Sequence, residues 1–322
     1  MKVLIYGAGV IGGQLCHALC KGNNDVTVVA RGNWAQVLKE NGLQIHHYIQ
    51  RKDTVDHPRV ITGIGPEHYD IVFAVMQYKQ MEQILMDLAK VNSPIVVLTG
   101  NNLSAKAMEE KIHNYSRNPK TVLFGFGSTA GTRENGKLNT VHTGEGMLTI
   151  GKAETEVSKE MKRIIKRTFK GSKVAISWCD HMDSWLKYHA AMILPIVYLC
   201  YKTNCDLRKS TPNERKLMLE AIKDAYHLLM SLGYPVRPAG DEKTLEPGIL
   251  NEGIKLVFYL MSKTKIGALC TTEHCKHAPG EMKDLHDAFM KIREMNPDYP
   301  MPYFDSLYGM MPSWDTIFNK YK

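Results

Sequence analysis

The first 31 residues constrain the fold of this chain more than any other segment. An apolar strand, Lys2 to Tyr6, leads directly into a glycine-rich turn and a helix, and a second apolar strand follows from Val26 to Ala30. The turn reads Gly7, Ala8, Gly9, Val10, Ile11 and Gly12. This order of elements is the layout of a Rossmann-type dinucleotide-binding unit. We therefore expect an α/β fold with a parallel sheet in this part of the chain.

The three glycines of the turn have separate physical roles. Gly7 permits the tight turn, Gly9 lets backbone amides approach a pyrophosphate, and Gly12 allows the helix to pack closely against the strand. The free amides at the start of the helix favour an anion. We expect the whole turn, residues 7–12, to bind the pyrophosphate of a dinucleotide, with a glycine-rich turn that holds no ligand as the alternative.

The residue after the second strand indicates which dinucleotide is bound. An acidic residue there accepts hydrogen bonds from the ribose of NAD, whereas an arginine accommodates the 2′-phosphate of NADP. This chain has Arg31. A charge-assisted contact to a phosphate contributes about 1.5–3 kcal/mol, which corresponds to about tenfold or greater preference. The expected cofactor is NADP, unless Arg31 is simply a solvated surface side chain.

Composition agrees with a soluble enzyme. The chain has 322 residues, 44% of them hydrophobic and 23% charged, which is enough for two domains with large cores. The longest apolar stretch, Ala190 to Tyr201, is too short to span a bilayer, and the N-terminus does not resemble a signal peptide. Seven cysteines without regular spacing favour reduced thiols. We expect a cytoplasmic protein that does not act at a membrane.

The net charge of +8 does not by itself indicate nucleic acid as a partner. The 41 basic residues are dispersed along the chain. Their densest run, Lys159 to Lys170, has helical spacing with apolar residues on the other face, so a solvated helix face explains it. A basic surface also suits a protein that binds a phosphorylated cofactor and a carboxylate substrate. We expect no nucleic-acid partner.

The strand–helix alternation continues up to Trp178 and then stops. Apolar strands at 69–76 and 94–99 flank a helix at 79–91, as in a parallel sheet, whereas 42–49 and 54–61 read as an antiparallel excursion. Short strands with glycine turns follow from 121 to 151, then the basic helix and a strand at 173–178. Beyond Trp178 we expect an all-α region with helices at 183–202, 213–232, 249–262 and 280–295. The predicted domains are a Rossmann-type NADP-binding domain, 1–178, and a helical substrate and dimerisation domain, 179–322.

Several landmarks together resemble the ketopantoate reductase family, the NADPH-dependent 2-dehydropantoate 2-reductases. They are the glycine turn with Arg31, the segments Gly125 to Lys137 and Gly144 to Gly151, and Asn101-Asn102-Leu103, which is similar to the Asn-Gly-Leu of the family. The resemblance runs over essentially the whole chain. It implies a two-domain reductase of small 2-oxo acids that takes part in pantothenate biosynthesis.

The resemblance also implies roles for four residues. Lys187, in Asp183-Ser-Trp-Leu-Lys187, matches the lysine that opens the first long helix of the second domain and would donate a proton to the ketone oxygen. Glu281 matches a glutamate that accepts a hydrogen bond from a substrate hydroxyl or helps to hold the lysine, and Asn101 would lie beside the nicotinamide and the substrate. Gln77 stands where the family has a basic residue at the cofactor. The other interpretations are a solvated Lys187 and a Glu281 that only stabilises the start of its helix.

Departures from the family pattern concern the substrate. The family commonly has asparagines four and eight residues after the lysine, and this chain has Ala191 and Pro195. A proline inside a helix removes a hydrogen bond and should kink the helix. With Gln77 also changed, ketopantoate itself is an open question.

Other candidate residues receive less specific interpretations. The segment Cys270 to His277 collects cysteines and histidines but lacks the paired spacings of a structural zinc site, so we expect no metal. We expect a loop there that lines the substrate pocket, with His274 and His277 as partners for a carboxylate. His189 lies two residues beyond Lys187 and so faces elsewhere on the helix, which favours ordinary packing.

Taken together, the sequence predicts NADPH-dependent reduction of a small, ketopantoate-like 2-oxo acid to the 2-hydroxy acid, with the proton from Lys187. One alternative is a binding protein that senses NADP without catalysis. Another is a dehydrogenase of a larger hydroxy acid or amino-acid derivative. The helical second domain offers surfaces for a homodimer.

Overall fold

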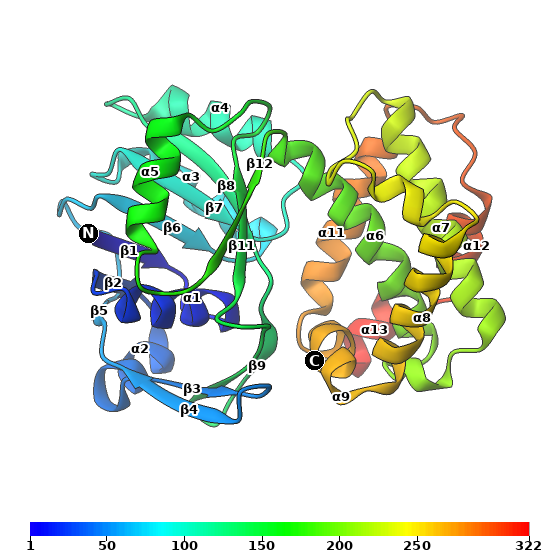
Figure 1. Ribbon diagram of the computed structural model, residues 1–322, viewed down its shortest axis with the longest axis horizontal. Helices are drawn as coiled ribbons and strands as arrows, with labels where there is room; N and C mark the ends of the chain where they lie inside the picture. The colour runs from blue at the N-terminus through cyan, green and yellow to red at the C-terminus, as the bar shows by residue number, and fades with distance from the viewer. Residues whose placement is uncertain (322) are drawn as a thin grey trace. The chain divides into compact units, whose positions relative to one another are not determined.

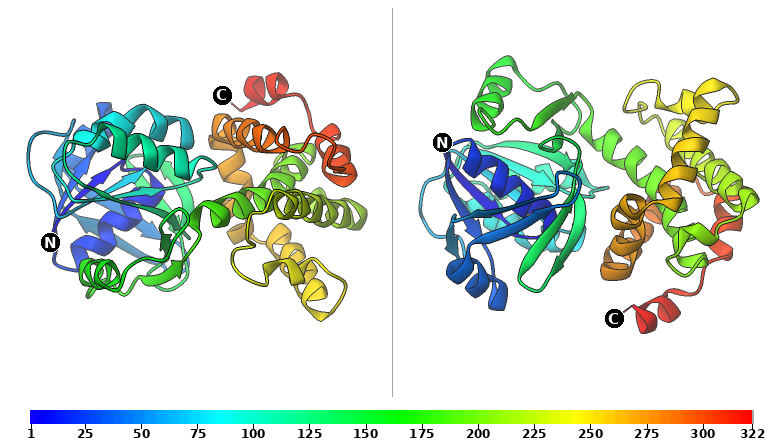
Figure 2. Two further views of the ribbon diagram at one scale, coloured as in Figure 1. Left: turned by 90° about the horizontal axis from the view of Figure 1, so that it is seen from above. Right: turned by 60° about the horizontal axis from the view of Figure 1, so that its bottom comes forward.

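The computed structural model describes residues 1–321, which form two compact units (Figure 1). The first unit comprises Met1–Asp183 and the second begins at Ser184. The predicted domain boundary lies between residues 178 and 179. This is a few residues before the end of the first unit at Asp183. Figure 2 shows that strands are confined to the first unit and that the second consists of helices. The expected α/β fold with an all-α C-terminal region is confirmed.

The first unit is built on an eight-stranded sheet with the order β12-β11-β8-β7-β6-β1-β2-β5. All neighbouring strands are parallel except β8 and β11. The strands are β1 (Lys2–Tyr6), β2 (Asp25–Val29), β5 (Arg59–Ile61), β6 (Ile71–Val75), β7 (Ile95–Thr99), β8 (Thr121–Gly127), β11 (Met147–Gly151) and β12 (Ala175–Cys179). Because β1, β6 and β7 are parallel neighbours, the loops that follow them meet at one edge of the sheet.

Helices alternate with these strands. They are α1 (Val10–Lys21), α2 (Gly32–Asn41), α3 (Tyr78–Lys90), α4 (Ala105–Tyr115) and α5 (Lys159–Thr168). The central strands β6 and β7 are buried along their whole length, as their unbroken apolar sequences require. Helix α5 turns Ile165 into the core, and its lysines and arginines lie on the other face.

A second, four-stranded sheet packs beside α1 and has the order β4-β3-β10-β9. Its strands are β3 (Leu43–His47), β4 (Lys52–Asp56), β9 (Ala130–Glu134) and β10 (Lys137–Val141). The antiparallel pairing of β3 with β4 confirms part of the predicted excursion. The rest of that prediction is wrong, because the chain leaves β4 at Asp56 and Arg59–Ile61 joins the main sheet as a parallel edge strand beside β2. Pro58 separates the two strands, since it cannot donate a ladder hydrogen bond.

The second unit consists of helices of very different length. They are α6 (Met182–Lys202), which begins at the end of the first unit, η1 (Leu207–Lys209), α7 (Pro212–Ser231), η2 (Asp241–Thr244), α8 (Ile249–Lys263), α9 (Lys265–Gly267), η3 (Ala268–Thr272), α10 (Glu273–His277), α11 (Pro279–Arg293), α12 (Pro302–Gly309) and α13 (Trp314–Lys320). Pro195 lies inside α6, which is one helix from end to end. No helix in residues 1–321 is both long enough and apolar enough to span a membrane.

The segment Cys270–His277 is helical, and the expectation of a loop there is wrong. It begins in the π-helical turn η3 and continues as α10. The backbone of the segment is therefore hydrogen-bonded as in a helix, and the hydroxyl of Thr272 also donates to the carbonyl of Ala268 at 3.0 Å. Helical hydrogen bonding therefore replaces the open loop that the mixed polar composition predicted.

Candidate active site

The glycines of the first turn occupy positions with different steric demands. Gly7 has a positive φ of 114°, and a Cβ there would lie 2.1 Å from the carbonyl oxygen of Val75. A Cβ on Gly12 would lie 1.9 Å from the carbonyl oxygen of Gly7. Both glycines are thus required by the close approach of α1, β1 and β6, as the fold of a dinucleotide-binding turn demands.

Gly9 differs because nothing in the protein requires a glycine there. It is the N-cap of α1 with an ordinary φ of −75°, and a Cβ would meet no atom within 4 Å. No side chain caps the first amides of α1. These features leave an open space in front of unpaired amide donors, which is the environment that a pyrophosphate needs. The turn therefore fits the phosphates of a dinucleotide.

Arg31 is exposed at the end of β2, where it is the N-cap residue of α2. Its guanidinium donates to the hydroxyl of Tyr6 and lies 5.7 Å from the Tyr6 ring centroid. Among residues 1–321 no carboxylate forms an ion pair with Arg31, so its charge is available to a ligand. Tyr6 is the last residue of β1, and it holds the guanidinium close to the glycine turn.

Two further side chains near the turn were not identified from the sequence. Trp34, in the first turn of α2, donates its indole N–H to the carbonyl oxygen of Ala8 at 2.8 Å. The guanidinium of Arg133, from β9, lies 5.2 Å from the Trp34 ring centroid. These contacts fix the start of α2 to the glycine turn and bring a second cation to the same region. The sequence around Trp34 has no pattern that predicts its hydrogen bond to Ala8.

Gln77 and Asn101 follow the parallel neighbours β6 and β7. Gln77 is the half-buried N-cap residue of α3. Gly100 adopts a φ of 140°, since a Cβ there would be 2.8 Å from the carbonyl oxygen of Met76, and the chain then continues to the half-buried Asn101. Both side chains thus belong to the sheet edge where ligands of such folds bind.

Asn102, which replaces the glycine of the family, has a structural role. It is buried, its Oδ1 accepts the amide of Ser104 at 2.8 Å, and its Nδ2 lies 3.2 Å from the sulfur of Met108. The side chain therefore orders the entry into α4. The replacement of glycine at this position changes the loop without adding a polar group directed to solvent.

Lys187 is a buried lysine in the second turn of α6. Only 4% of its surface is exposed, and its ammonium lies 4.8 Å from the ring centroid of Tyr234. Tyr188, the next residue of α6, donates its hydroxyl to the backbone carbonyl of Tyr234 at 2.9 Å and so fixes that residue. Burying an ammonium group costs free energy unless other groups stabilise it. Buried ionisable side chains of this kind are concentrated at functional sites. Lys187 is therefore not the solvent-exposed lysine that the alternative interpretation expected.

Glu281 lies in the first turn of α11, where it is 8% exposed. Its Oε2 is 3.2 Å from Nε2 of His274, which α10 positions. Burial lowers the pKa of His274, but the hydrogen bond and the charge of Glu281 outweigh that effect and raise it. Glu281 thus has a histidine partner, whose pKa it raises, as well as the favourable field of a helix N-terminus. His277 instead lies 3.9 Å from Glu273 and is exposed.

His189 packs as a neutral ring. It stacks on Trp185 with 5.0 Å between the centroids, and burial lowers its pKa to about 4. In the residues that the structure describes, no cluster of three or more histidine, cysteine or acidic side chains could hold a metal ion. All seven cysteines are free thiols.

Comparison with known proteins finds a family model that matches the N-terminal part of the chain. Residues 3–155 match the family model of ketopantoate reductase PanE/ApbA. The uncharacterized oxidoreductase YkpB of Bacillus subtilis is 23% identical over 287 residues, which cover 82% of this chain and 92% of that protein. The 2-dehydropantoate 2-reductase of Archaeoglobus fulgidus is 26% identical over 242 residues, 74% of this chain and 78% of the relative.

Solved structures share the fold over nearly the whole chain. A structure of 2-dehydropantoate 2-reductase from Methylococcus capsulatus has a TM-score of 0.72 at 15% identity and covers 96% of this chain and 95% of its own. D-mandelate dehydrogenase in complex with NADH has a TM-score of 0.73, also at 15% identity, over 99% of this chain and all of its own. The family match confirms the expectation of an oxidoreductase. Over residues 3–155 the chain thus matches a ketopantoate reductase PanE/ApbA domain, and over nearly its whole length it has the fold of these solved structures.

Proposed function

We propose that this protein reduces a small 2-oxo acid to the 2-hydroxy acid with NADPH. The buried ammonium of Lys187 carries the proposal, because it separates an enzyme from a protein that merely binds the cofactor. A lysine that is 4% exposed and held over an aromatic ring is poised to act on a ligand rather than to solvate a surface. The glycine turn and Arg31 support NADP as the cofactor.

The proposed roles follow from the chemistry of the side chains. Lys187 donates a hydrogen bond and then its proton to the ketone oxygen, and it stabilises the negative charge that develops there. Glu281 accepts a hydrogen bond from the substrate, and Asn101 orients the reacting carbonyl. NADPH supplies the hydride when it is bound. Gly7 to Gly12 hold its pyrophosphate, Arg31 holds its 2′-phosphate, and Gln77 contacts it at the end of β6.

A second substrate class is favoured by the face of α6 that follows Lys187. Ala191 and Pro195, one and two turns further on, are buried and offer no side-chain hydrogen bond. A 2-oxo acid with an apolar side chain suits such a face better than the hydroxyl of ketopantoate. If ketopantoate is nonetheless the substrate, the reaction belongs to pantothenate biosynthesis. We also propose that the enzyme is cytoplasmic and forms a homodimer.

The test is NADPH oxidation with a panel of 2-oxo acids that includes ketopantoate, 2-oxoisovalerate and phenylglyoxylate. We expect turnover with at least one of them, and faster turnover with the two apolar acids if the α6 face sets specificity. Binding of NADPH without oxidation by any acid would favour the sensor. Oxidation of larger hydroxy acids alone would assign the reaction to a dehydrogenase of such substrates.

Replacing Lys187 tests the proton donor. We expect Lys187→Met, which keeps the apolar stem, and Lys187→Ala to reduce kcat by roughly 100-fold or more, because general acid catalysis is lost. The affinity for NADPH should stay nearly unchanged. Lys216→Ala, an exposed lysine of α7, is the matched control and should keep full activity. Equal turnover in the Lys187 variants would remove the assigned role.

A further inference from the structure

The second unit contains a cavity that none of the proposed active-site residues lines. Its empty volume, including its opening to solvent, is about 540 Å³, and small-molecule sites commonly measure about 300–1,000 Å³. Neither Lys187 nor Glu281 contributes to its walls. Most of the lining is apolar and comes from three helices: Ile196 and Leu199 of α6, Met218 of α7, and Val257, Phe258 and Met261 of α8.

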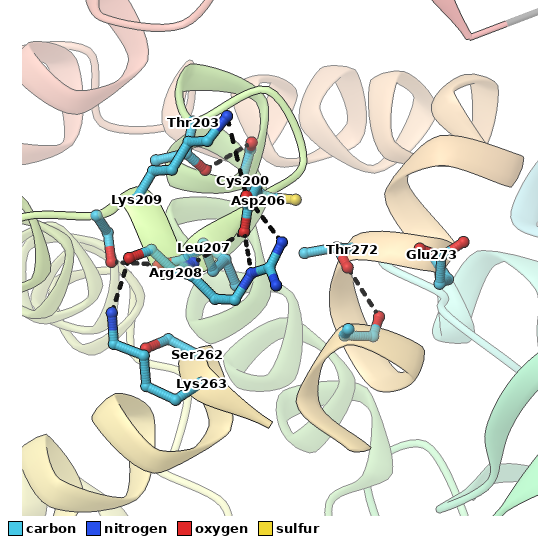
Figure 3. Close-up of polar contacts among 12 residues, drawn as sticks. Cys200, Thr203, Asp206, Leu207, Arg208, Lys209, Ser262, Lys263, Thr272 and Glu273 are labelled. Carbon is cyan, nitrogen blue, oxygen red and sulfur yellow. Dashed lines mark hydrogen bonds and ion pairs between the residues drawn. The ribbon is translucent and has the colours of Figure 1, made fainter. Parts of the chain in front are cut away.

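Hydrogen bonds fix one wall of this cavity. Leu207 of η1 lines it, and the carbonyl of the next residue, Arg208, accepts from the ammonium of Lys263 at the end of α8, at 2.7 Å (Figure 3). Oδ1 of Asp206 accepts from Nε of Arg208, also at 2.7 Å. These contacts join η1 to the C-terminal end of α8. The wall that the two elements form is therefore in place before any ligand binds.

Arg215 is the one charged residue among those that line the cavity. Its Nη1 donates to the carbonyl of Ser210 at 2.5 Å and to the hydroxyl of Ser210 at 3.2 Å. Within residues 1–321, Nε and Nη2 of Arg215 have no acceptor, and no carboxylate forms an ion pair with this side chain. The hydroxyls of Ser210 and Ser262, which also line the cavity, donate to backbone carbonyls. The guanidinium is therefore the main donor left for a ligand.

The chemistry of this cavity defines its occupant. The edge of a guanidinium that carries Nε and Nη2 matches the two oxygens of a carboxylate. The apolar walls favour a hydrocarbon chain, whereas a sugar or a nucleotide would leave polar groups there without partners. We propose that the cavity binds an apolar monocarboxylate of the size of a medium-chain fatty acid, with the carboxylate on Arg215. This proposal does not rest on the proposed reductase activity, because it uses none of the residues assigned to it.

The first test is calorimetric titration of the full-length protein with octanoate at pH 7.5. We expect one molecule per chain, with a Kd on the order of tens of micromolar. Hexanoate should bind about tenfold more weakly, because each methylene moved out of water contributes about fourfold. 1-Octanol should also bind at least tenfold more weakly, since a hydroxyl cannot form the paired, charge-assisted hydrogen bonds of a carboxylate.

Two variants test the two ends of the ligand separately. Arg215→Met should weaken octanoate to the level of 1-octanol and leave 1-octanol within about twofold of its wild-type affinity. Lys216→Met removes the adjacent, exposed cation of α7 and is the matched control, which should bind octanoate as the wild type does. Ile196→Trp fills the cavity from α6 and should abolish binding of both compounds, with an unchanged circular dichroism spectrum.

A further variant separates this cavity from the proposed active site. Lys187→Met should bind octanoate with unchanged affinity, because Lys187 does not line the cavity. This result is expected whether or not the protein reduces a 2-oxo acid, so the failure of one proposal is distinguishable from that of the other. Loss of octanoate binding in Lys187→Met would place the fatty acid in the active site and overturn the proposal.

Three other outcomes also overturn it. The first is no binding of octanoate at concentrations up to 1 mM. The second is equal affinity for octanoate and 1-octanol in the wild type, which would leave the carboxylate without a role. The third is octanoate binding that survives in both Arg215→Met and Ile196→Trp, since neither the charge nor the cavity would then be used.

Discussion

At the scale of single residues, the turn after β1 separates what the fold needs from what a ligand needs. A side chain on Gly7 or Gly12 would collide with backbone carbonyl oxygens, whereas one on Gly9 would meet no protein atom. Two of the three glycines are therefore required by packing, whereas Gly9 leaves space that is open to a ligand. This difference leads to a prediction that measures stability and cofactor affinity separately.

Gly9→Ala should lose cofactor affinity, whereas Gly12→Ala should lose stability. Gly9→Ala should keep its stability in urea within about 0.5 kcal/mol, because its φ of −75° suits alanine, but should bind NADPH much more weakly. Gly12→Ala should lose about 1–3 kcal/mol of stability from overpacking. Urea unfolding and fluorescence titration with NADPH check both variants. Unchanged NADPH affinity in Gly9→Ala would show that no ligand uses the open space.

Arg31→Ala should alter the choice of cofactor. We expect it to weaken NADPH about tenfold or more and to leave NADH nearly unchanged, because only NADPH carries the 2′-phosphate. Lys39→Ala, an exposed cation on the same helix, is the control and should change neither affinity. Dissociation constants for both cofactors provide the measurement. If the ratio of the two constants stays as in the wild type, the 2′-phosphate lies elsewhere.

Sequence alone identified the residues with a strong local pattern, and these predictions await tests. The glycine turn and Arg31 could be named because their spacing follows from the strand–helix–strand unit. Trp34 and Tyr234 could not, because each matters through a neighbour distant in sequence. His274 was named only as a partner for a carboxylate of the substrate, and its contact with Glu281 was not predicted. The indole bond to Ala8, the ring beneath Lys187 and the ion pair to Glu281 are tertiary contacts without a local signature.

At the scale of elements, the small sheet is joined to α1 by a buried histidine cluster. Nδ1 of His142 donates to the carbonyl of Gly144 at 3.0 Å, which leaves its Nε2 to accept from Nδ1 of His47 at 2.9 Å. His17, from α1, pairs with Asp56 at 2.8 Å and lies 5.0 Å from the His47 ring centroid. The hydrogen bond between His47 and His142 requires the accepting ring, His142, to be neutral.

Acid should therefore weaken the small sheet. Burial lowers the pKa of His47 to about 4, and the neighbouring His17 and His142 act in the same direction. Since the unfolded chain takes up this proton near pH 6.5, stability is complete above that value and declines as the pH falls toward 4. The loss from His47 reaches about 3 kcal/mol at most. Urea unfolding at pH 7 and at pH 4.5 measures it.

His47→Gln should show a smaller loss of stability between these pH values than the wild type, because the titrating ring is gone. His46→Gln changes the adjacent residue of β3, whose side chain is 40% exposed, and should keep the full loss. Buried histidines that do not contact His47, such as His189 and His286, titrate equally in both variants and cancel in the comparison. Identical pH dependence in His47→Gln and His46→Gln would exclude His47 as the source.

Element prediction succeeded where a hydrophobic period was long and clear. Helices α3, α5, α6, α7, α8 and α11 and the central strands were expected close to their observed bounds. The error at Arg59–Ile61 arose because a three-residue edge strand takes its partner from β2, and no local pattern shows this. Residues 270–277 are helical, although the mix of cysteines, histidines and threonines suggested a loop.

At the scale of the whole molecule, the two units differ in how much their sequences reveal. The first is a succession of strands and helices whose ligand edge follows from topology, so its chemistry could be predicted. The second is a set of helices, and neither the contacts of Lys187 nor the exposure of apolar residues on α8 follows from periodicity. Family resemblance supplied the candidate residues there, and the structure supplied their surroundings.

The two edge strands of the large sheet, β5 and β12, have a consequence for solubility. On one side the last strand, β5, has only three residues. On the other side, β12 directly follows Lys170 and Lys173, both exposed. Short edges and neighbouring positive charges oppose the docking of further strands, which is how sheet proteins escape fibril formation. At high concentration this protein should therefore stay free of cross-β aggregates even when its molecules meet often.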